Sequence, residues 1–157
     1  MILQQILEHK TSEVEERAAT FPLAEIQARA KAASPARVPD FSATMSLIAE
    51  VKRRSPSQGD IVSAFDPVAQ ARACQAGGAS AISVLTDSRF FGGCFDDLSA
   101  VRQAVSVPIL CKDFILTPYQ LYEARAHGAD LVLLIVAALD DAQLWEFQAL
   151  ARDLGMT

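Results

Sequence analysis

Charged side chains stand at the end of a short apolar segment, residues 47–52, where they could take part in catalysis. In an extended strand Ile48, Glu50 and Lys52 point to the same side, because side chains alternate with a period of two. A carboxylate and an ammonium group so placed could form a buried pair in which each keeps the other charged. The pattern favours a reactive pair, and the alternative is a solvated pair at a strand end.

A second lysine ends another apolar segment, residues 107–112. Leu110 and Lys112 share one face of this segment, and Phe114 lies in the loop that follows. A lysine at a mostly apolar strand end can protonate a carbonyl oxygen or form a Schiff base, because desolvation lowers its pKa. Lys112 alone could equally be a surface lysine, whereas Lys112 together with Lys52 indicates a functional site.

Two loops carry groups that could bind a ligand. Residues 86–97 hold Phe90 and Phe91 followed by two glycines, which favours a flexible loop that packs over an apolar ring. The alternative is that one ring fills the core and the other caps it. The run Arg-Arg-Ser at 53–55 could bind a carboxylate or phosphate, or lie in a solvated loop. Asp87 is interpreted as a structural residue that caps its loop.

Length and charge exclude several classes of protein. The 157-residue sequence has a formal net charge of −5, whereas affinity for nucleic acid needs concentrated Lys and Arg. The longest apolar run, residues 131–139, is far shorter than the roughly 20 residues that span a bilayer. We therefore expect a cytoplasmic protein with neither a nucleic-acid nor a membrane partner.

Cysteine and histidine residues are too scattered to predict a metal site. His9 and His127 have no partner ligands nearby in the sequence. The number of cysteines is odd and their spacing fits no metal motif, so we expect reduced thiols. The three cysteines are Cys74, Cys94 and Cys111.

Short apolar segments alternate with segments of helical periodicity. The expected strands are residues 47–52, 80–86, 107–112 and 129–137. The expected helices are residues 66–79, 95–106, 117–129 and 139–155. Such alternation predicts parallel strands covered by helices, in an open doubly wound sheet or in a barrel. The first turn lacks the glycine patterns that bind nucleotides, which favours the first four units of an α/β TIM barrel.

Residues 1–46 differ from the rest of the chain. They are rich in Ala, Glu and Arg, and Phe21-Pro22 interrupts the helical spacing of their apolar residues. One or two helices followed by an irregular link are expected there. The predicted organisation is a helical extension over residues 1–46 and the first half of a βα-barrel over residues 47–157.

Four runs resemble one enzyme family and lie in the order that the family requires. They are ILEHKTSEVEERA at 6–18, LIAEVKRRSPSQGDI at 47–61, AISVLTDSRFFGGCFDDL at 81–98 and VPILCKDFILTPYQLYEARAHGADLVLLI at 107–135. Together they resemble the indole-3-glycerol phosphate synthases over essentially the whole chain. The runs EVKRRSPSQG and LCKDF are the most specific of these matches.

The resemblance implies a carboxy-lyase of tryptophan biosynthesis that uses neither a cofactor nor a metal. Its substrate is carboxyphenylamino-deoxyribulose 5-phosphate, a phosphosugar joined to anthranilate, which closes to indole-3-glycerol phosphate with loss of CO2 and water. The resemblance implies that Lys112 is the general acid at the ketone oxygen. It also implies that Lys52 holds the substrate carboxylate and that Glu50 orients the two lysines.

Other residues are expected to contact the substrate by the same resemblance. Ser55 and Pro56 would shape the loop over the sugar phosphate. The aromatic ring would lie in a pocket lined by Phe91, Phe114 and Leu133.

The remaining catalytic groups of the family belong to strands five to eight, which would follow Thr157. They are a glutamate that acts as base, an asparagine and the phosphate-binding loops. We therefore expect a fragment with half a site that is inactive alone and self-associates through its open sheet edges. Two alternatives stay open: a non-catalytic half-barrel scaffold, and a Schiff-base aldolase that uses Lys112.

Overall fold

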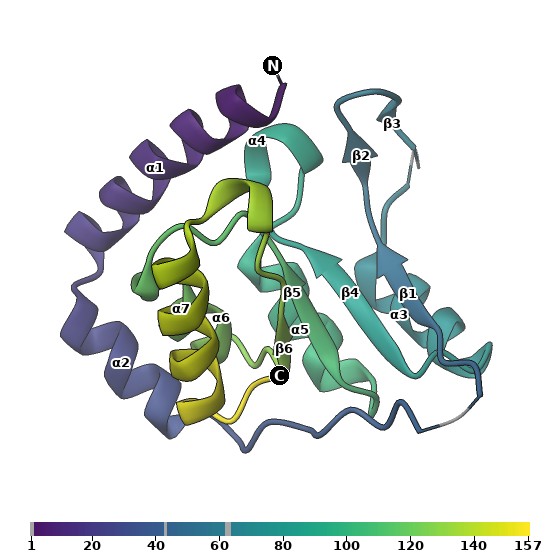
Figure 1. Cartoon of the computed structure of the whole chain (residues 1–157). Coiled ribbons are helices and arrows are strands. Elements are labelled where there is room, and N and C mark those ends of the chain that lie inside the picture. Colours follow the sequence, from purple (N-terminus) through teal and green to yellow (C-terminus); the bar gives the residue numbers. More distant parts are fainter. Residues whose placement is uncertain (1, 43, 62–63) are drawn as a thin grey trace.

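A computed structural model describes residues 2–42, 44–61 and 64–157 and shows one parallel sheet with helices around it (Figure 1). The strands of this sheet are β1 (Ile48–Val51), β4 (Ala81–Leu85), β5 (Ile109–Lys112) and β6 (Leu131–Val132). The longer helices that follow them are α3 (Pro67–Ala76), α5 (Phe95–Ala104), α6 (Pro118–Ala126) and α7 (Asp141–Asp153). The short elements are β2 (Arg54–Ser55), β3 (Gly59–Asp60), α4 (Ser88–Phe91) and the 3-10 helix η1 (Val136–Ala138).

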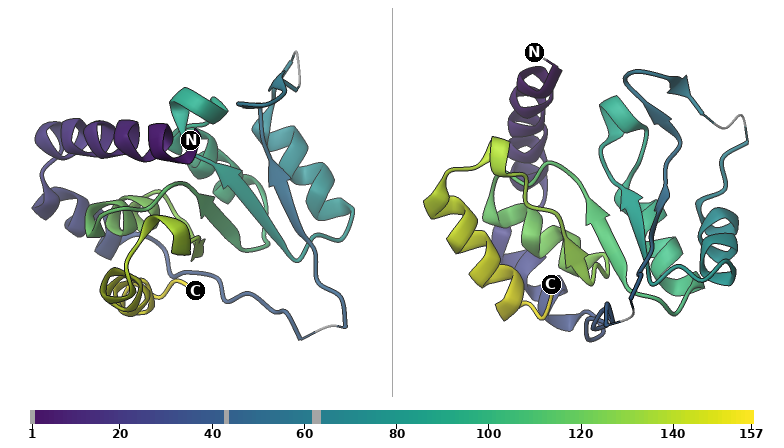
Figure 2. Two further views of the ribbon diagram at one scale, coloured as in Figure 1. Left: turned by 45° about the horizontal axis from the view of Figure 1, so that its top comes forward. Right: turned by 45° about the vertical axis from the view of Figure 1, so that its right-hand side comes forward.

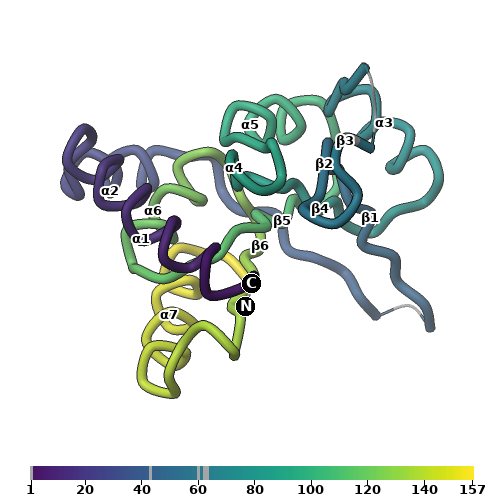
Figure 3. The backbone as a smooth tube through the Cα atoms, turned by 90° about the horizontal axis from the view of Figure 1, so that it is seen from above, coloured from purple at the N-terminus to yellow at the C-terminus, as the bar shows by residue number. Residues whose placement is uncertain are grey.

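The strands lie side by side in the order β1-β4-β5-β6, which is also their order along the chain, and each neighbouring pair is parallel. Seen from above, α3, α5, α6 and α7 follow one another around the outer side of the curved sheet (Figure 3). A doubly wound sheet would reverse the strand order and carry helices on both faces. Sequential order with the helices outside is the arrangement of a βα-barrel, so the predicted first half of a TIM barrel is confirmed.

Hydrophobic side chains on the outer face of the sheet pack against these helices. Val51, Val84 and Cys111 are at most 2% exposed and belong to one core. Because side chains alternate along a strand, the neighbours of these residues point to the opposite, inner face. Glu50 and Lys112 are among those neighbours, as the sequence predicts.

Capping residues fix where the helices begin. Asp66 accepts a hydrogen bond of 2.9 Å from the backbone N–H of Ala69, and Pro67 occupies the first position of α3. The side chain of Asp140 does the same for Gln143 in α7, at 2.8 Å. The predicted helices therefore appear within a few residues of their expected bounds.

Two helices precede the sheet, α1 (Ile2–Thr20) and α2 (Leu23–Ala32), and the chain breaks between them at Phe21-Pro22 as predicted. α2 packs along α6, and Val14, Ile26 and Tyr119 form a small apolar cluster there. The extended link after α2 passes under the amino ends of the strands (Figure 1). The division of the chain into an extension and a half-barrel stays a prediction.

Two segments differ from the sequence-based prediction. The strand predicted over 129–137 ends at Val132, because the register pairs Val132 with Cys111 and β5 ends one residue later. The turn after β1 contains the antiparallel pair β2–β3, which stands beyond the carboxyl end of β1 beside α4 (Figure 2). Paired segments this short carry no periodic pattern from which they could be predicted.

Candidate active site

Lys52, Glu50 and Lys112 meet at the carboxyl ends of the strands. The Nζ atom of Lys52 lies 2.7 Å from Oε1 of Glu50, and the ammonium group of Lys112 donates to Oε2 of the same carboxylate. β1 and β5 are not neighbours, since β4 lies between them. In β4, Ser83 is level with Glu50 and Leu85 is level with Lys112, so the side chain of Lys112 reaches across β4 to the carboxylate. One carboxylate thus joins the two lysines that the sequence predicts to act together.

This mouth cluster, Glu50 with Lys52 and Lys112, is open to solvent and carries surplus positive charge. The side chains remain 27%, 31% and 38% exposed, respectively. The predicted burial of the pair is wrong, because these groups lie at the carboxyl ends of the strands, where each side chain keeps more than a quarter of its surface exposed. Burial raises the pKa of Glu50, but hydrogen bonds from Lys112 and Lys52 outweigh it and hold the pKa below its ordinary value. The carboxylate therefore stays ionised and balances only one of the two ammonium groups.

Two aromatic rings from different loops face each other near this end of the sheet. Phe91 ends α4, and Phe114 follows β5 after one residue. Their ring centroids are 6.2 Å apart, and the ring planes are tilted by 32°. Both side chains are half-buried, so an apolar ligand face could still contact them. Phe90 instead contacts the edge of the His9 ring on α1, with centroids 5.9 Å apart.

The segment that carries Phe91 contains a helical turn, α4, within the predicted loop. Asp87 caps α4 by accepting hydrogen bonds from the backbone N–H groups of Phe90 and Phe91, at 2.7 and 3.2 Å. Gly92 ends the turn with φ of 66°, a left-handed conformation. A Cβ atom on Gly93 would lie 1.9 Å from the carbonyl oxygen of Leu85. The glycines are thus required by geometry, and the prediction that Asp87 caps its loop is confirmed.

Ser55, Pro56 and Leu133 lie around the open end but make no direct contact with the mouth cluster. The hydroxyl of Ser55 accepts a hydrogen bond of 3.3 Å from the backbone N–H of Gln58, and Pro56 is exposed. Leu133 follows β6 with 36% of its surface exposed. Within the described ranges, no hydrogen bond or ion pair joins any of the three predicted residues to Lys52 or Lys112. Their contact with substrate stays a prediction.

The two arginines of the run 53–55 are engaged within the chain. The guanidinium group of Arg54 donates to the backbone carbonyls of Ser88 and Arg89 and so ties β2 to α4. That of Arg53 lies 4.8 Å from the centroid of the Phe65 ring. The sequence also allows an anion site here, but these contacts assign the arginines to the packing of the loops.

A second cluster, around Lys10, lies outside the residues that the sequence predicts to be functional. The ammonium group of Lys10 on α1 lies 2.9 Å from Glu13, 3.0 Å from Asp87 and 2.9 Å from Asp113. The side chain of Lys10 has no exposed surface, and those of Asp87 and Asp113 are at most 2% exposed. We call Lys10, Asp87 and Asp113 the anchor cluster. It joins α1 to the residues that follow β4 and β5.

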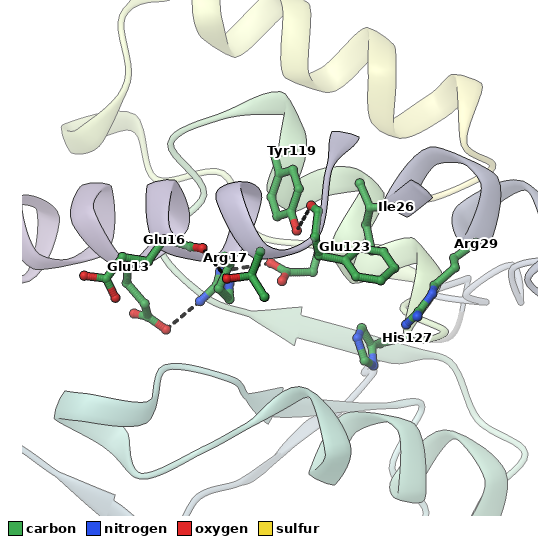
Figure 4. A pocket seen from close by; sticks show the side chains of 10 residues that line it. Glu13, Glu16, Arg17, Ile26, Arg29, Tyr119, Glu123 and His127 are labelled. Atoms are coloured by element: carbon green, nitrogen blue, oxygen red, sulfur yellow. Dashed lines mark hydrogen bonds and ion pairs between the residues drawn. The ribbon is translucent and has the colours of Figure 1, made fainter. Parts of the chain in front are cut away.

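One cavity of about 420 Å³ lies between α1, α2 and α6, and its lining includes Glu13, the α1 partner of Lys10 (Figure 4). At its edge Arg17 bridges Glu13 and Glu123, at 2.5 and 2.9 Å. The hydroxyl of Tyr119 donates to the carbonyl of Phe21 at 3.1 Å. No predicted site residue lines this cavity. Its polar groups are used to hold the N-terminal helices against α6.

Two further features concern the described part of the chain. Within residues 2–42, 44–61 and 64–157, no group of three or more His, Cys, Asp or Glu side chains is arranged to hold a metal ion. No helix in the same ranges has the length and apolar character needed to cross a membrane.

Barrel order of the strands, with charged side chains at their carboxyl ends, defines the class of protein. In βα-barrel enzymes the catalytic groups stand at these strand ends and on the loops that follow them. Lys52, Glu50, Lys112 and the facing rings of Phe91 and Phe114 occupy such positions. The described residues therefore form the first half of a βα-barrel enzyme.

Comparison with known proteins identifies the family. A family model described as indole-3-glycerol phosphate synthase matches residues 3–157. The chain is 51% identical to the indole-3-glycerol phosphate synthase of Microcystis aeruginosa, over 99% of the chain and 54% of that protein. It is 52% identical to that of Mycolicibacterium gilvum and 50% to that of Roseiflexus sp., again over 99% of the chain, and over 58% and 61% of those proteins. The chain belongs to the indole-3-glycerol phosphate synthase family, and it spans just over half the length of these relatives.

Proposed function

We propose that this chain supplies the general-acid half of an indole-3-glycerol phosphate synthase active site. The observation that carries the proposal is the mouth cluster, in which one carboxylate, Glu50, holds the ammonium groups of Lys52 and Lys112. The facing rings of Phe91 and Phe114 lie on the loops next to it. The proposed substrate is carboxyphenylamino-deoxyribulose 5-phosphate.

Lys112 acts as the general acid in the proposed ring closure. The anthranilate carbon that bears the carboxylate attacks the ketone carbon, and negative charge develops on the ketone oxygen. The ammonium group of Lys112 gives that oxygen its proton, so that a hydroxyl group forms. The bond to the carboxylate then breaks, CO2 leaves, and its electron pair returns to the ring. The hydroxyl group then leaves as water together with a proton from the new five-membered ring, which completes the indole.

Lys52 and Glu50 prepare this step. The surplus positive charge of the mouth cluster suits a substrate that carries a carboxylate, and Lys52 holds that carboxylate until CO2 departs. Glu50 stays ionised because both lysines lower its pKa, and it orients the two ammonium groups. Lys52 also assists the final dehydration.

Apolar and loop residues bind the rest of the substrate. Phe91, Phe114 and Leu133 line the pocket for the anthranilate ring and keep water from it. Ser55 and Pro56 shape the loop over the sugar phosphate. Family membership favours this ring closure over an aldolase reaction of Lys112.

The test is a complementation assay that follows the fluorescence of the indole product. The 157-residue chain is mixed with the C-terminal part of the Mycolicibacterium gilvum relative that lies beyond the region matching this chain. We expect turnover in the mixture and none from the chain alone, because a base and a phosphate site must come from the other polypeptide. Turnover that survives Lys112→Ala, or turnover by the chain alone, would contradict the proposed half-site.

The open sheet also supports a proposal about assembly. Ile48 on β1 is 45% exposed and Leu133 after β6 is 36% exposed, although both are large apolar residues. We infer that two copies of the 157-residue chain associate through these inner faces when no complement is present. Sedimentation of the isolated chain should show a dimer or larger species, and a monodisperse monomer would exclude it. As a biosynthetic enzyme with three free thiols, the protein is proposed to act in the cytoplasm.

A further inference from the structure

Lys10 occupies an unusual place on α1. It lies in the middle of a buried stripe formed with Ile6 and Val14, at positions where a helix that packs on a core normally carries apolar residues. Its ammonium group is fully enclosed and lies within 3.0 Å of carboxylate oxygens of Asp87 and Asp113. A lysine is placed this way only if carboxylates surround its charge, and here Asp87 and Asp113, which follow two strands of the sheet, do so together with Glu13 of α1.

Each of these aspartates also holds the backbone of an aromatic residue. The Oδ1 atom of Asp87 accepts hydrogen bonds from the N–H groups of Phe90 and Phe91, while its Oδ2 atom faces Lys10. The Oδ1 atom of Asp113 accepts a hydrogen bond of 2.8 Å from the N–H of Phe114 and also faces Lys10. The ammonium group of Lys10 is therefore linked to the backbone of Phe91 through Asp87 and to the backbone of Phe114 through Asp113.

We propose that Lys10 is a positioning residue that sets the separation of Phe91 and Phe114, and through it the fit of the substrate's aromatic ring. This inference rests on the proposed function for the identity of the ligand. The anchor cluster ties α4 and the segment after β5 to one point on α1. A substrate ring that packs against both side chains depends on their relative position, which the anchor fixes before the substrate arrives.

Loss of the charge has a defined physical consequence. Without the ammonium group, the buried carboxylates of Asp87 and Asp113 lose the cation that both contact, so they repel or take up a proton. Either response moves their loops and with them the two rings. Among the described residues, Lys10 pairs with Glu13, Asp87 and Asp113 and not with Glu50, so the acid itself is left in place.

The test compares Lys10→Met with a control, Lys31→Met, because Lys31 is an exposed lysine on α2. In the complemented enzyme, Lys10→Met should raise the KM for carboxyphenylamino-deoxyribulose 5-phosphate about tenfold, because the rings no longer fit the substrate. Its kcat should change less than threefold, and the pH profile of kcat should not move. An unchanged KM, or a fall in kcat with a shifted pH profile, would overturn the assignment.

A second measurement separates this inference from the proposed function. Fluorine NMR of the 157-residue chain labelled with fluorophenylalanine reports the ring environments of Phe91 and Phe114 without any substrate. Lys10→Met should shift both resonances and Lys31→Met neither. If the wild-type mixture shows no turnover, the proposed function fails while the ring shifts still decide the role of Lys10. Unshifted resonances in Lys10→Met would refute that role.

A variant in which all three residues of the anchor cluster are neutral covers the case in which Lys10→Met does not fold. The triple variant Lys10→Met, Asp87→Asn, Asp113→Asn keeps amide oxygens that can accept the backbone hydrogen bonds, and it removes the repulsion. We expect it to fold with the two resonances returned part of the way towards their wild-type positions. Resonances displaced as far as in an unfolded chain would show that the ammonium group does not act through these carboxylates.

Discussion

Two clusters of lysine and carboxylate side chains lie at one end of the sheet and differ in burial and in charge ratio. The anchor cluster sets the one ammonium group of Lys10 against two aspartates and is almost fully enclosed. The mouth cluster sets two ammonium groups against Glu50 and keeps about a third of each side chain exposed. The aspartates of the anchor cluster accept hydrogen bonds from the protein's own backbone. The mouth cluster instead retains a surplus positive charge for a ligand. Burial and charge ratio, rather than residue type, separate a positioning role from a chemical one.

The largest expected effect is on chemistry at the mouth cluster. Lys112→Ala should lower kcat of the complemented enzyme by about 10³-fold, because the developing charge on the ketone oxygen loses its proton donor. Its stability should change by less than about 1 kcal/mol, because the ion pair with Glu50 is partly exposed. Steady-state kinetics and urea unfolding measure the two quantities, and Lys31→Ala serves as the control. A large loss of stability with little loss of kcat would mean that the mouth cluster has a structural role and not a chemical one.

The next effect is on stability at the anchor cluster. Lys10→Met should lower the free energy of unfolding by about 3 kcal/mol, because it leaves two buried carboxylates without their cation. Lys52→Met, which removes an ammonium group from the mouth cluster, should cost less than about 1 kcal/mol. Urea unfolding monitored by circular dichroism compares the two variants. Equal losses would mean that burial does not distinguish the clusters.

A smaller effect is expected at the turn that connects the two regions. Gly93→Ala should destabilise the chain by about 2 kcal/mol, because its Cβ atom would meet the carbonyl oxygen of Leu85 at 1.9 Å. Gly77→Ala is a matched control, since Gly77 has φ of −75° and a Cβ atom there would find its nearest neighbours at 3.4 Å. That change should be neutral or slightly stabilising. Thermal melts of both variants check the prediction, which an unchanged Gly93→Ala melt would contradict.

The smallest expected effects are changes of stability with pH, one at alkaline pH and one at acid pH. Burial lowers the pKa of Lys10, but Asp113, Glu13 and Asp87 outweigh it and raise the pKa above its ordinary value. The contribution of Lys10 should thus be complete below about pH 10, the region of an unfolded lysine, and be lost as pH rises further. Glu50 has a lowered pKa, so its contribution, under about 1 kcal/mol, should be present above about pH 4 and be lost at lower pH. Unfolding across pH should show the alkaline loss disappear in Lys10→Met and the acid loss shrink in Glu50→Gln.

The mouth cluster could be predicted from sequence because local rules describe it. Alternation along a strand places Glu50 and Lys52 on one face, and the βα pattern brings Lys112 to the same end of the sheet. The openness of the cluster could not be predicted, since it depends on how the loops pack around the strand ends. Family resemblance supplied the roles of these residues but not their geometry.

The anchor cluster was missed because its partners are distant in sequence. Lys10 belongs to a helix, whereas Asp87 and Asp113 follow two different strands. A lysine on a helix is usually solvated, and Lys10 is assigned no role from the sequence. One local signal was present: Lys10 falls between Ile6 and Val14 at helical spacing, so it interrupts an apolar stripe. A charged residue in such a stripe predicts a buried partner, although the sequence does not say which.

The most direct test measures kcat and KM for Lys112→Met and Lys10→Met side by side in the complemented enzyme. The two changes remove the same charge from two clusters that differ in burial and in charge ratio. We expect Lys112→Met to lower kcat with little change in KM, and Lys10→Met to raise KM with little change in kcat. If both variants alter the same kinetic constant, the division between a reactive mouth cluster and a positioning anchor cluster is wrong.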